Sequence, residues 1–184
     1  MLSILTKKGR QQFAKPFFHD YRTLLGLWLI VAVIAAIMKM EPSRCNNFLI
    51  FRGVFWHTWN GTSLYAAYPA EYFDINHYGP LFSLIIAPFA VVPHWLGLLM
   101  WEVALAMFLY IAVRKSQFNK RQQLFVLWFC AHELLTALYM QQFNIGIAAI
   151  ILLSYYYIDK ALDARAAFFL HLRKKVKKKK IVWM

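Results

Sequence analysis

Apolar residues in this chain are gathered into long runs that charged residues interrupt at few places. The first run, Leu24 to Met38, contains no charged residue and is rich in Leu, Ile, Val and Ala. Further runs extend from Leu124 to Tyr139 and from Ile145 to Ile158. Because a helix of about 20 apolar residues spans the hydrocarbon core of a bilayer, such runs predict transmembrane helices. The predicted fold class is therefore all-α, in a polytopic membrane protein.

The first apolar run also resembles the core of a cleaved signal peptide, because the small residues Ala35 and Ala36 could precede a cleavage site. However, the basic segment before the run is long, and further apolar runs follow it. We therefore favour an uncleaved signal-anchor helix at residues 23–40.

The apolar stretch from Pro80 to Val113 is too long for one helix and is broken by Pro88 and Pro93. It forms either two spans joined at Pro93 and the next residue, or an interfacial segment at 80–92 followed by one span at 95–113. As a helix, the first part would extend only about 20 Å, which is shorter than the roughly 30 Å of hydrocarbon.

The distribution of basic residues decides between these two topologies. Lys and Arg gather in three short segments: before the first run, between residues 113 and 122, and in the tail after residue 158. Such residues accumulate on the cytoplasmic side, and all three segments share that side only if 95–113 crosses alone. We therefore predict about four transmembrane helices, at 23–40, 95–113, 123–140 and 145–158. The cytoplasmic segments are then the N-terminus 1–22, the loop 114–122 and the basic tail 159–184.

The same topology puts the segment 41–94 and the short turn 141–144 on the outer face. The segment 41–94 is long, aromatic and nearly balanced in charge. Loops of this length are uncommon without a function, and catalytic residues are often found on loops that a rigid scaffold positions. We therefore predict an outer loop that carries an interfacial helix at 80–92 and most of the functional residues.

Composition agrees with a membrane protein, since the 184 residues are 61% apolar and only 16% charged. The net charge of +13 could indicate nucleic-acid binding. Because the basic residues flank apolar runs, we predict membrane lipids as partners and no nucleic acid. The two cysteines, Cys45 and Cys130, form no disulfide framework, and no residue cluster has metal-site spacing. We expect no metal and no cofactor.

Acids and histidines in the outer segment are candidates for catalysis. Glu71 and Asp74 are the acids of its later part, and His57 and His77 lie on the same side. A carboxylate near an imidazole can serve as a general base. The alternative interpretation is solvated loop charge beside aromatic residues that anchor the loop at the membrane.

Three ionisable residues lie inside predicted helices: Glu102, His132 and Glu133. Charged groups at membrane depth usually face a partner or a wet cavity. These three therefore either pair across helices or line a polar site. In the outer turn, Gln141, Gln142 and Asn144 either cap the helix ends or face a ligand.

Several motifs in order resemble glycosyltransferase family 87, a group of polyprenyl-phosphate-mannose-dependent mannosyltransferase-like proteins of the GT-C class. The resemblance covers about Tyr21 to Asp159. It is carried by Asn46-Asn47-Phe48, Gly61-Thr62-Ser63-Leu64-Tyr65, Tyr78-Gly79-Pro80-Leu81-Phe82-Ser83-Leu84 with Ala87-Pro88-Phe89, Trp101, and Gln142-Phe143-Asn144, which is similar to a Gly-Gln-x-Asn turn of the family.

The resemblance implies a membrane hexosyltransferase with a GT-C-like fold, located in the plasma (inner) membrane with a cytoplasmic N-terminus. It would transfer a hexose, with mannose as our first choice, from a polyprenyl-phosphate donor to an extracytoplasmic glycan or glycolipid. A carboxylate in the first outer loop would act as general base with inversion at the anomeric carbon, and polar groups would stabilise the departing lipid phosphate.

The chain departs from the family where the acid is expected, because Asn46 and Asn47 stand there. Either Asp74, which we favour, or Glu71 takes the catalytic role, or the protein is inactive. The residues that we expect to bind substrate are Asn46, Asn47, Arg52, His57, Tyr65, His77, Tyr78, Gln142 and Asn144.

The chain is also shorter than members of the family. Residues 166–170 resemble the start of another helix, and basic residues replace the apolar sequence from Arg173 onward. A truncated or frame-shifted gene product, equivalent to the amino-terminal part of the family, would have this pattern, and so would a genuine short protein. The alternative function is therefore a non-catalytic scaffold, or a lipid- or glycan-binding subunit of a cell-envelope assembly. A small transporter or channel is a third hypothesis.

Overall fold

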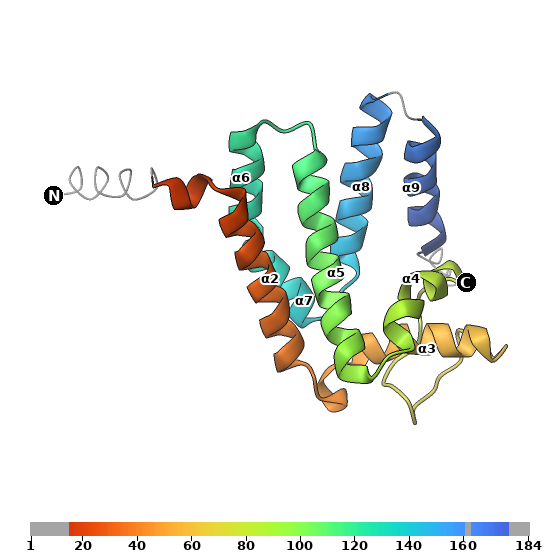
Figure 1. The fold of residues 1–184 in the computed structure, drawn as a ribbon. Helices are drawn as coiled ribbons and strands as arrows, with labels where there is room; N and C mark the ends of the chain where they lie inside the picture. Colours follow the sequence, from red (N-terminus) through yellow and green to blue (C-terminus); the bar gives the residue numbers. More distant parts are fainter. Residues whose placement is uncertain (1–14, 161–162, 177–184) are drawn as a thin grey trace, which may run out of the picture.

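The computed structural model describes residues 15–160 and 163–176, and its regular structure in these ranges is helical, which confirms the all-α prediction (Figure 1). Two short 3-10 helices, η1 and η2, accompany eight α-helices. The elements are η1 (Pro16–His19), α2 (Tyr21–Met38), η2 (Pro42–Arg44), α3 (Asn46–Trp59), α4 (Leu81–Ala90), α5 (His94–Lys115), α6 (Lys120–Phe129), α7 (Ala131–Tyr139), α8 (Asn144–Asp159) and α9 (Asp163–Val176).

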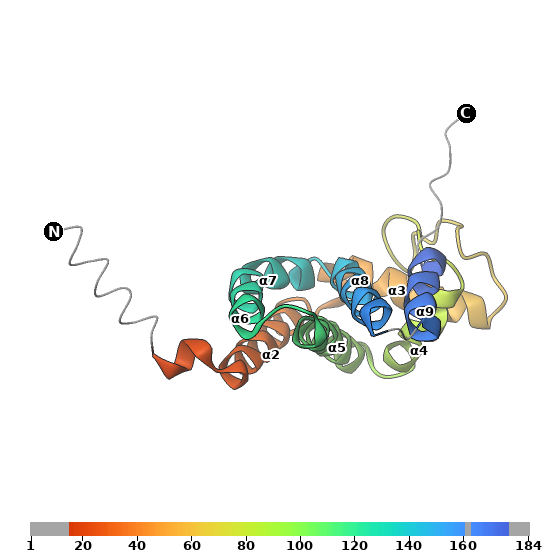
Figure 2. The same cartoon turned by 90° about the horizontal axis from the view of Figure 1, so that it is seen from above.

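The long helices run side by side, and α3 lies across one of their ends (Figure 1). Helix α2 packs against α5 and α7, α5 packs against α8, and α8 packs against α9. In Figure 2, α2, α5, α8 and α9 form a row, with α6 and α7 on one side of it. The segments 41–94 and 141–143 therefore lie together at one end, here called the α3 end. The loop 116–119 lies at the opposite end.

Helices α2 and α5 are long and apolar enough to cross a membrane. The region predicted as the third span, 123–140, is divided into α6 and α7, because the backbone at Cys130 adopts ψ −2° instead of the usual helical value near −42°. The fourth predicted span forms α8, an apolar helix of 16 residues. Two candidate spans are therefore present in the described residues, and crossing by α6–α7 and α8 stays a prediction.

The segment 41–94 contains a helix, α3, that we did not predict. Its buried residues Phe48, Phe51 and Val54 recur every three positions, so they share one face, and α3 packs closely against α4. Helix α4 occupies the segment predicted as interfacial, 80–92. It is short because Pro88 cannot donate the helical backbone hydrogen bond, and it ends two residues later.

The segment predicted as a basic cytoplasmic tail, 159–184, contains a helix that includes residues 166–170, which resembled the start of a helix in the sequence. Residues 163–176 form α9, which turns back along α8 and contacts α4 near the α3 end. The rings of Tyr157 and Phe169 stack between α8 and α9, with centroids 5.5 Å apart. Residues 1–14 of the predicted basic N-terminus, and residues 161–162 and 177–184 of the predicted tail, lie outside the described residues.

An aromatic cluster of Phe51, Phe82, Trp101 and Phe143 joins α3, α4, α5 and the start of α8. The ring centroid of Phe82 lies 5.2 Å from those of Phe51 and Phe143. The ring of Trp101 stacks on that of Phe143, with centroids 5.7 Å apart. Ring pairs at these separations stabilise a fold beyond their buried area. The cluster therefore fixes three helices and the turn 141–144 relative to one another.

Helices α4 and α5 approach each other closely at Gly97. A Cβ atom at this position would overlap the backbone carbonyl oxygen of Phe89 and contact the ring of Phe48. Backbone cannot move aside as easily as a flexible side chain. Glycine at 97 therefore permits the tight corner that begins α5 beneath the α3 end.

Candidate functional site

A cleft at the α3 end, here called the Asp74 cleft, brings together six of the predicted site residues. Its volume is about 260 Å³, and it lies between α3, the segment 74–78 and the turn 141–144. The predicted residues in its lining are Asn47, Asp74, His77, Tyr78, Gln142 and Asn144, and they are joined by Ile50, Phe51, Ile75, Gln141 and Phe143.

Asp74 is exposed and sits at an unusual backbone angle, with φ at 84°. Asp and Asn adopt positive φ more readily than other residues with a Cβ atom. One carboxylate oxygen, Oδ1, accepts a hydrogen bond of 2.8 Å from the N–H of Ile75. Among the described residues no donor contacts Oδ2, so this oxygen can accept a proton or a hydrogen bond from a ligand.

Asn46 holds the backbone immediately before Asp74. Its Nδ2 donates to the carbonyl of Phe73 at 2.5 Å, and its Oδ1 accepts from the N–H of Phe73 at 2.7 Å. This two-point contact spans 27 positions of sequence and fastens the loop to the start of α3. Asn46 therefore positions Asp74 and does not line the cleft itself.

Asn76 holds the backbone on the other side of Asp74. Its Oδ1 accepts from the N–H of Tyr78 at 2.8 Å, and its Nδ2 donates to the carbonyls of Leu64 and Tyr78 at 3.1 and 2.9 Å. Sequence analysis did not single out Asn76. The sequence did contain a signal for this role. Asn76 lies in an irregular segment, and there an Asn side chain often forms hydrogen bonds with the backbone two residues further on.

The turn 141–144 supplies amide groups to the cleft. Gln141 has φ at 49°, and its N–H and that of Gln142 donate to carbonyls in the last turn of α7, at 2.7 and 2.9 Å. This left-handed cap commonly requires Gly. Within the turn, Nδ2 of Asn144 donates to Oε1 of Gln142 at 3.1 Å, and Nδ2 of Asn47 donates to the carbonyl of Met140 at 2.7 Å.

Tyr78 forms an aromatic wall of the cleft. Its ring stacks on Phe82 with centroids 4.4 Å apart and meets Phe51 edge-on at 5.1 Å. Burial raises the pKa of the Tyr78 phenol to about 12, so the hydroxyl stays neutral at physiological pH. The cleft thus combines one carboxylate, one imidazole, several amides and aromatic rings.

Glu71 and His57, both predicted at the site, form a separate contact. His57 is only 6% exposed, and its ring stacks on Tyr68 with centroids 3.7 Å apart. Its Nδ1 lies 2.9 Å from Oγ1 of Thr62, and its Nε2 lies 3.2 Å from Oε2 of Glu71. The Nε2 contact is misaligned for a hydrogen bond, so it is an electrostatic contact at most. His57 therefore fastens the loop 62–71 to the end of α3.

Arg52 and Tyr65 also lie away from the cleft lining. The guanidinium of Arg52 donates to the carbonyls of Ala90 and Val92 at 2.9 and 3.2 Å, which satisfies backbone groups at the end of α4. Burial lowers the pKa of Arg52 below its ordinary value. The N–H of Tyr65 donates to Oγ of Ser63 at 3.4 Å within the loop.

The ionisable residues inside helices do not pair across helices in the described residues. His132 and Glu133 are neighbours on α7 and are mostly exposed. Nδ1 of His132 lies 3.7 Å from Oε1 of Glu133. The carboxylate of Glu102 is buried in α5 without a hydrogen-bond donor among the described residues, and Nε1 of Trp101 has no acceptor there.

The described residues contain no group of three or more His, Cys, Asp or Glu side chains close enough to hold a metal ion. Cys45 and Cys130 are both free thiols. The Sγ atom of Cys45 lies 3.1 Å from Nε2 of His94, and burial raises the pKa of this thiol to about 11. Cys45 is therefore a buried, protonated thiol at the junction of α3 and α5.

Comparison with known proteins gives one family. The family model of glycosyltransferase family 87 matches residues 76–172, which include six residues of the cleft: His77, Tyr78, Gln141, Gln142, Phe143 and Asn144. No curated protein and no solved structure matches the chain. Because the family match covers more than half of the sequence and includes part of the cleft, the chain belongs to glycosyltransferase family 87.

Proposed function

We propose that this chain acts in the transfer of a hexose, with mannose as our first choice, from a polyprenyl-phosphate donor to an extracytoplasmic glycan or glycolipid. The observation that carries the proposal is the convergence of Asp74, His77, Gln142 and Asn144 in one cleft of a family 87 chain. These residues come from two segments more than sixty positions apart.

The chemistry of the cleft suits a sugar. Each hydroxyl of a hexose can donate and accept hydrogen bonds, and each side-chain amide offers both functions. In the turn 141–144, the mutual bond of Gln142 and Asn144 leaves Nε2 of Gln142 and Oδ1 of Asn144 available. The ring of Tyr78 adds an apolar surface against which the carbon face of a sugar can pack.

Asp74 is the proposed general base. It would take the proton of the acceptor hydroxyl while the hydroxyl oxygen forms a bond to the anomeric carbon of the donor. The bond between that carbon and the phosphate oxygen breaks, and its electron pair leaves with the lipid phosphate. We assign stabilisation of the leaving phosphate to His77, which lines the same cleft as Asp74 and comes from the same segment of the chain.

The proposed membrane arrangement puts the α3 end outside and the opposite end in the cytoplasm of a multi-pass plasma membrane protein. Four crossings would be made by α2, α5, α6–α7 and α8. The first of two observations supports a membrane interface at the α3 end, and the second supports the orientation. Exposed rings at the α3 end include Trp59 and Trp95, as in an aromatic belt, whereas Arg114, Lys115 and Arg121 lie at the opposite end.

The test compares donors in membranes that contain the full chain. A radiolabelled polyprenyl-phosphate mannose and the corresponding nucleotide sugar are supplied separately, and the label in the glycolipid and glycan fractions is measured. We expect transfer from the polyprenyl-phosphate donor alone. Transfer from the nucleotide sugar alone, or no transfer with either donor, would contradict the proposal.

One observation favours a second candidate, a non-catalytic subunit that binds a lipid-linked sugar or a glycan. Asn46 stands where the resemblance places an acid, and both polar atoms of its side chain are committed to the backbone of Phe73. The cleft then contains a single carboxylate, Asp74. Saturable binding of the donor without any transfer would establish this second function.

A further inference from the structure

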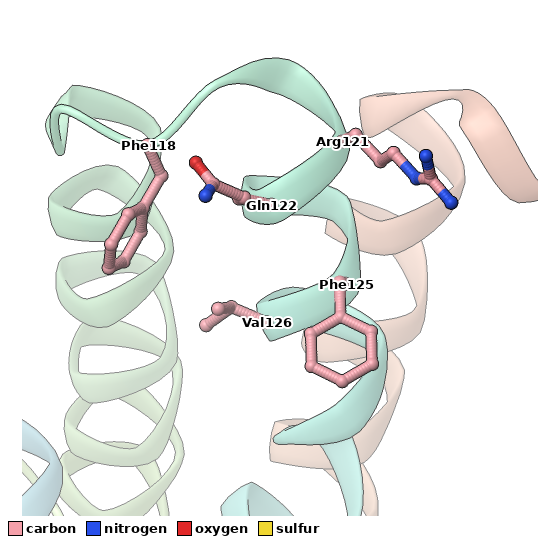
Figure 3. Close-up of a pocket in the computed structure, with 5 residues that line it drawn as sticks. All are labelled: Phe118, Arg121, Gln122, Phe125 and Val126. Carbon is pink, nitrogen blue, oxygen red and sulfur yellow. The ribbon is translucent and has the colours of Figure 1, made fainter.

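The face of α6 carries an apolar ridge with a hollow on either side. One hollow, of about 320 Å³, is lined by Phe118, Arg121, Gln122, Phe125 and Val126 (Figure 3). The second hollow, of about 340 Å³, is lined by Phe18, His19, Arg121, Leu124, Phe125 and Trp128. Arg121 and Phe125, one helical turn apart, line both hollows and therefore separate them.

The ridge continues along α6 away from the charged end of the helix. Phe125 is 66% exposed and Phe129 is 71% exposed, and their rings stack with centroids 5.6 Å apart. Arg121, Phe125 and Phe129 are spaced by four residues, so they lie above one another on one face. A single cation thus stands at the end of an exposed aromatic ridge.

Arg121 differs from Arg114 and Lys120 in having no protein partner among the described residues. The guanidinium of Arg114 lies 3.3 Å from the ring centre of Tyr21 and donates to Gln123, and Lys120 lies 5.8 Å from the same ring. Arg121 is exposed, and in Figure 3 its side chain points to the side of α6 away from Phe118 and Gln122. The first turn of α6 adds a positive dipole end nearby. The charge of Arg121 is available to an anion.

We propose that this face of α6 binds one anionic phospholipid, with the phosphate at Arg121 and one acyl chain in each hollow beside Phe125. A cation above two apolar hollows complements a phosphate above two hydrocarbon chains. Arg binds phosphate with paired hydrogen bonds. The site rests on the membrane arrangement proposed above and lies at the end of the molecule opposite to the Asp74 cleft, so it is distinct from the donor site.

Lipid bound to the folded state alone raises thermal stability. We would reconstitute the full chain in nanodiscs of phosphatidylcholine, with and without phosphatidylglycerol, and measure the midpoint of thermal unfolding and the lipid retained in native mass spectra. The variants are Arg121→Gln and a matched control, Lys115→Gln, which removes the same charge from an exposed residue outside both hollows.

We expect phosphatidylglycerol to raise the unfolding midpoint of the wild type and of Lys115→Gln. Arg121→Gln should lose most of this shift and bind the lipid roughly tenfold more weakly, as expected for one charge-assisted contact. Phe125→Ala should reduce retention while the headgroup preference remains. Inorganic phosphate should not reproduce the shift, because it lacks chains.

If Arg121→Gln and Lys115→Gln lose the same part of the shift in unfolding midpoint, the proposed site is wrong. The lipid is then attracted by basic charge in general. An equal shift with inorganic phosphate would replace the lipid by a free anion. A disulfide-linked dimer of Phe129→Cys in the nanodisc would assign the ridge to a second copy of the chain. Since none of these readouts uses sugar transfer, failure here is distinguishable from failure of the proposed function.

Discussion

Asp74 and Glu71 lie three residues apart in one loop, yet their surroundings differ completely. Asp74 lines a cleft with amides from a distant turn, and its Oδ2 is open to a ligand. Glu71 faces the buried imidazole of His57 at the far end of α3. The Asp74 side of the loop thus presents polar groups to a ligand, whereas the Glu71 side uses them to fasten the loop.

This difference shows that nearness in sequence does not make two carboxylates equivalent candidates for a general base. Asn46 divides the loop, because its side chain forms two hydrogen bonds with the backbone of Phe73, which lies between Glu71 and Asp74 in the sequence. Before Phe73 the chain packs onto the end of α3. After Phe73 it passes over the aromatic cluster.

Replacing Asp74 by Asn should abolish most of the transfer activity. Asn has the same shape and tolerates positive φ, so the fold should be unchanged, but it cannot take a proton from the acceptor. We expect the rate to fall by at least about 100-fold, the lower limit for general acid–base catalysis, with no change in unfolding midpoint. A loss of less than about threefold would remove Asp74 from this role.

Asn46→Ala should weaken both the fold and the site, because it deletes two hydrogen bonds to the backbone of Phe73. We expect the free energy of unfolding to fall by about 1–3 kcal/mol, with a parallel loss of transfer. The control is Asn46→Asp, which keeps the bond from the N–H of Phe73 and introduces an acid. A tenfold gain of activity in Asn46→Asp would move the catalytic base from Asp74 to this position.

Gln141→Gly should change the stability of the protein little, because relief of backbone strain opposes the loss of a buried side chain that lines the cleft. Gln141 has φ at 49°, where glycine is not strained, and its side chain makes one long hydrogen bond, 3.5 Å from Nε2 to the carbonyl of Tyr139. We expect the free energy of unfolding, measured by denaturant titration, to change by less than about 1 kcal/mol in either direction. Met140→Gly, at negative φ, is the matched control and should destabilise.

Glu71→Gln should have the smallest effect. The carboxylate is half exposed, so its contact with His57 is weakened by solvent and contributes less than about 1 kcal/mol. We expect transfer to stay within about threefold of the wild type. A loss comparable to that of Asp74→Asn would show that the two acids act together and would break the division of the loop.

Much of the fold could be predicted from the sequence because apolar runs dictate it. The run from Leu24 to Met38 became α2, and α4 lies within the predicted interfacial segment 80–92, before the break at Pro93. Helix α3 was not predicted, because its buried face is mixed with Arg52 and His57, which suggested a polar loop. Both polar side chains have a structural role. Arg52 donates a hydrogen bond to a backbone carbonyl at the end of α4, and His57 contacts Thr62 in the loop that follows α3.

The cleft could be predicted only in part. Family motifs pointed to Tyr78, Gln142 and Asn144, and the structure brings these residues together. Composition could not distinguish Asp74 from Glu71, because the distinction depends on contacts made across 27 positions by Asn46. Likewise, the return of α9 along α8 depends on stacking of Phe169 with Tyr157, which the basic character of the tail concealed.

The most direct test of the central claim is to map where the donor binds. A photoreactive polyprenyl-phosphate mannose is cross-linked to the full chain in membranes, and the labelled peptides are identified by mass spectrometry, with unmodified donor as competitor. Labels in residues 74–78 and 141–144 that the competitor removes are the result we predict. Competed labels confined to residues 57–71, beside His57 and Glu71, would contradict the account.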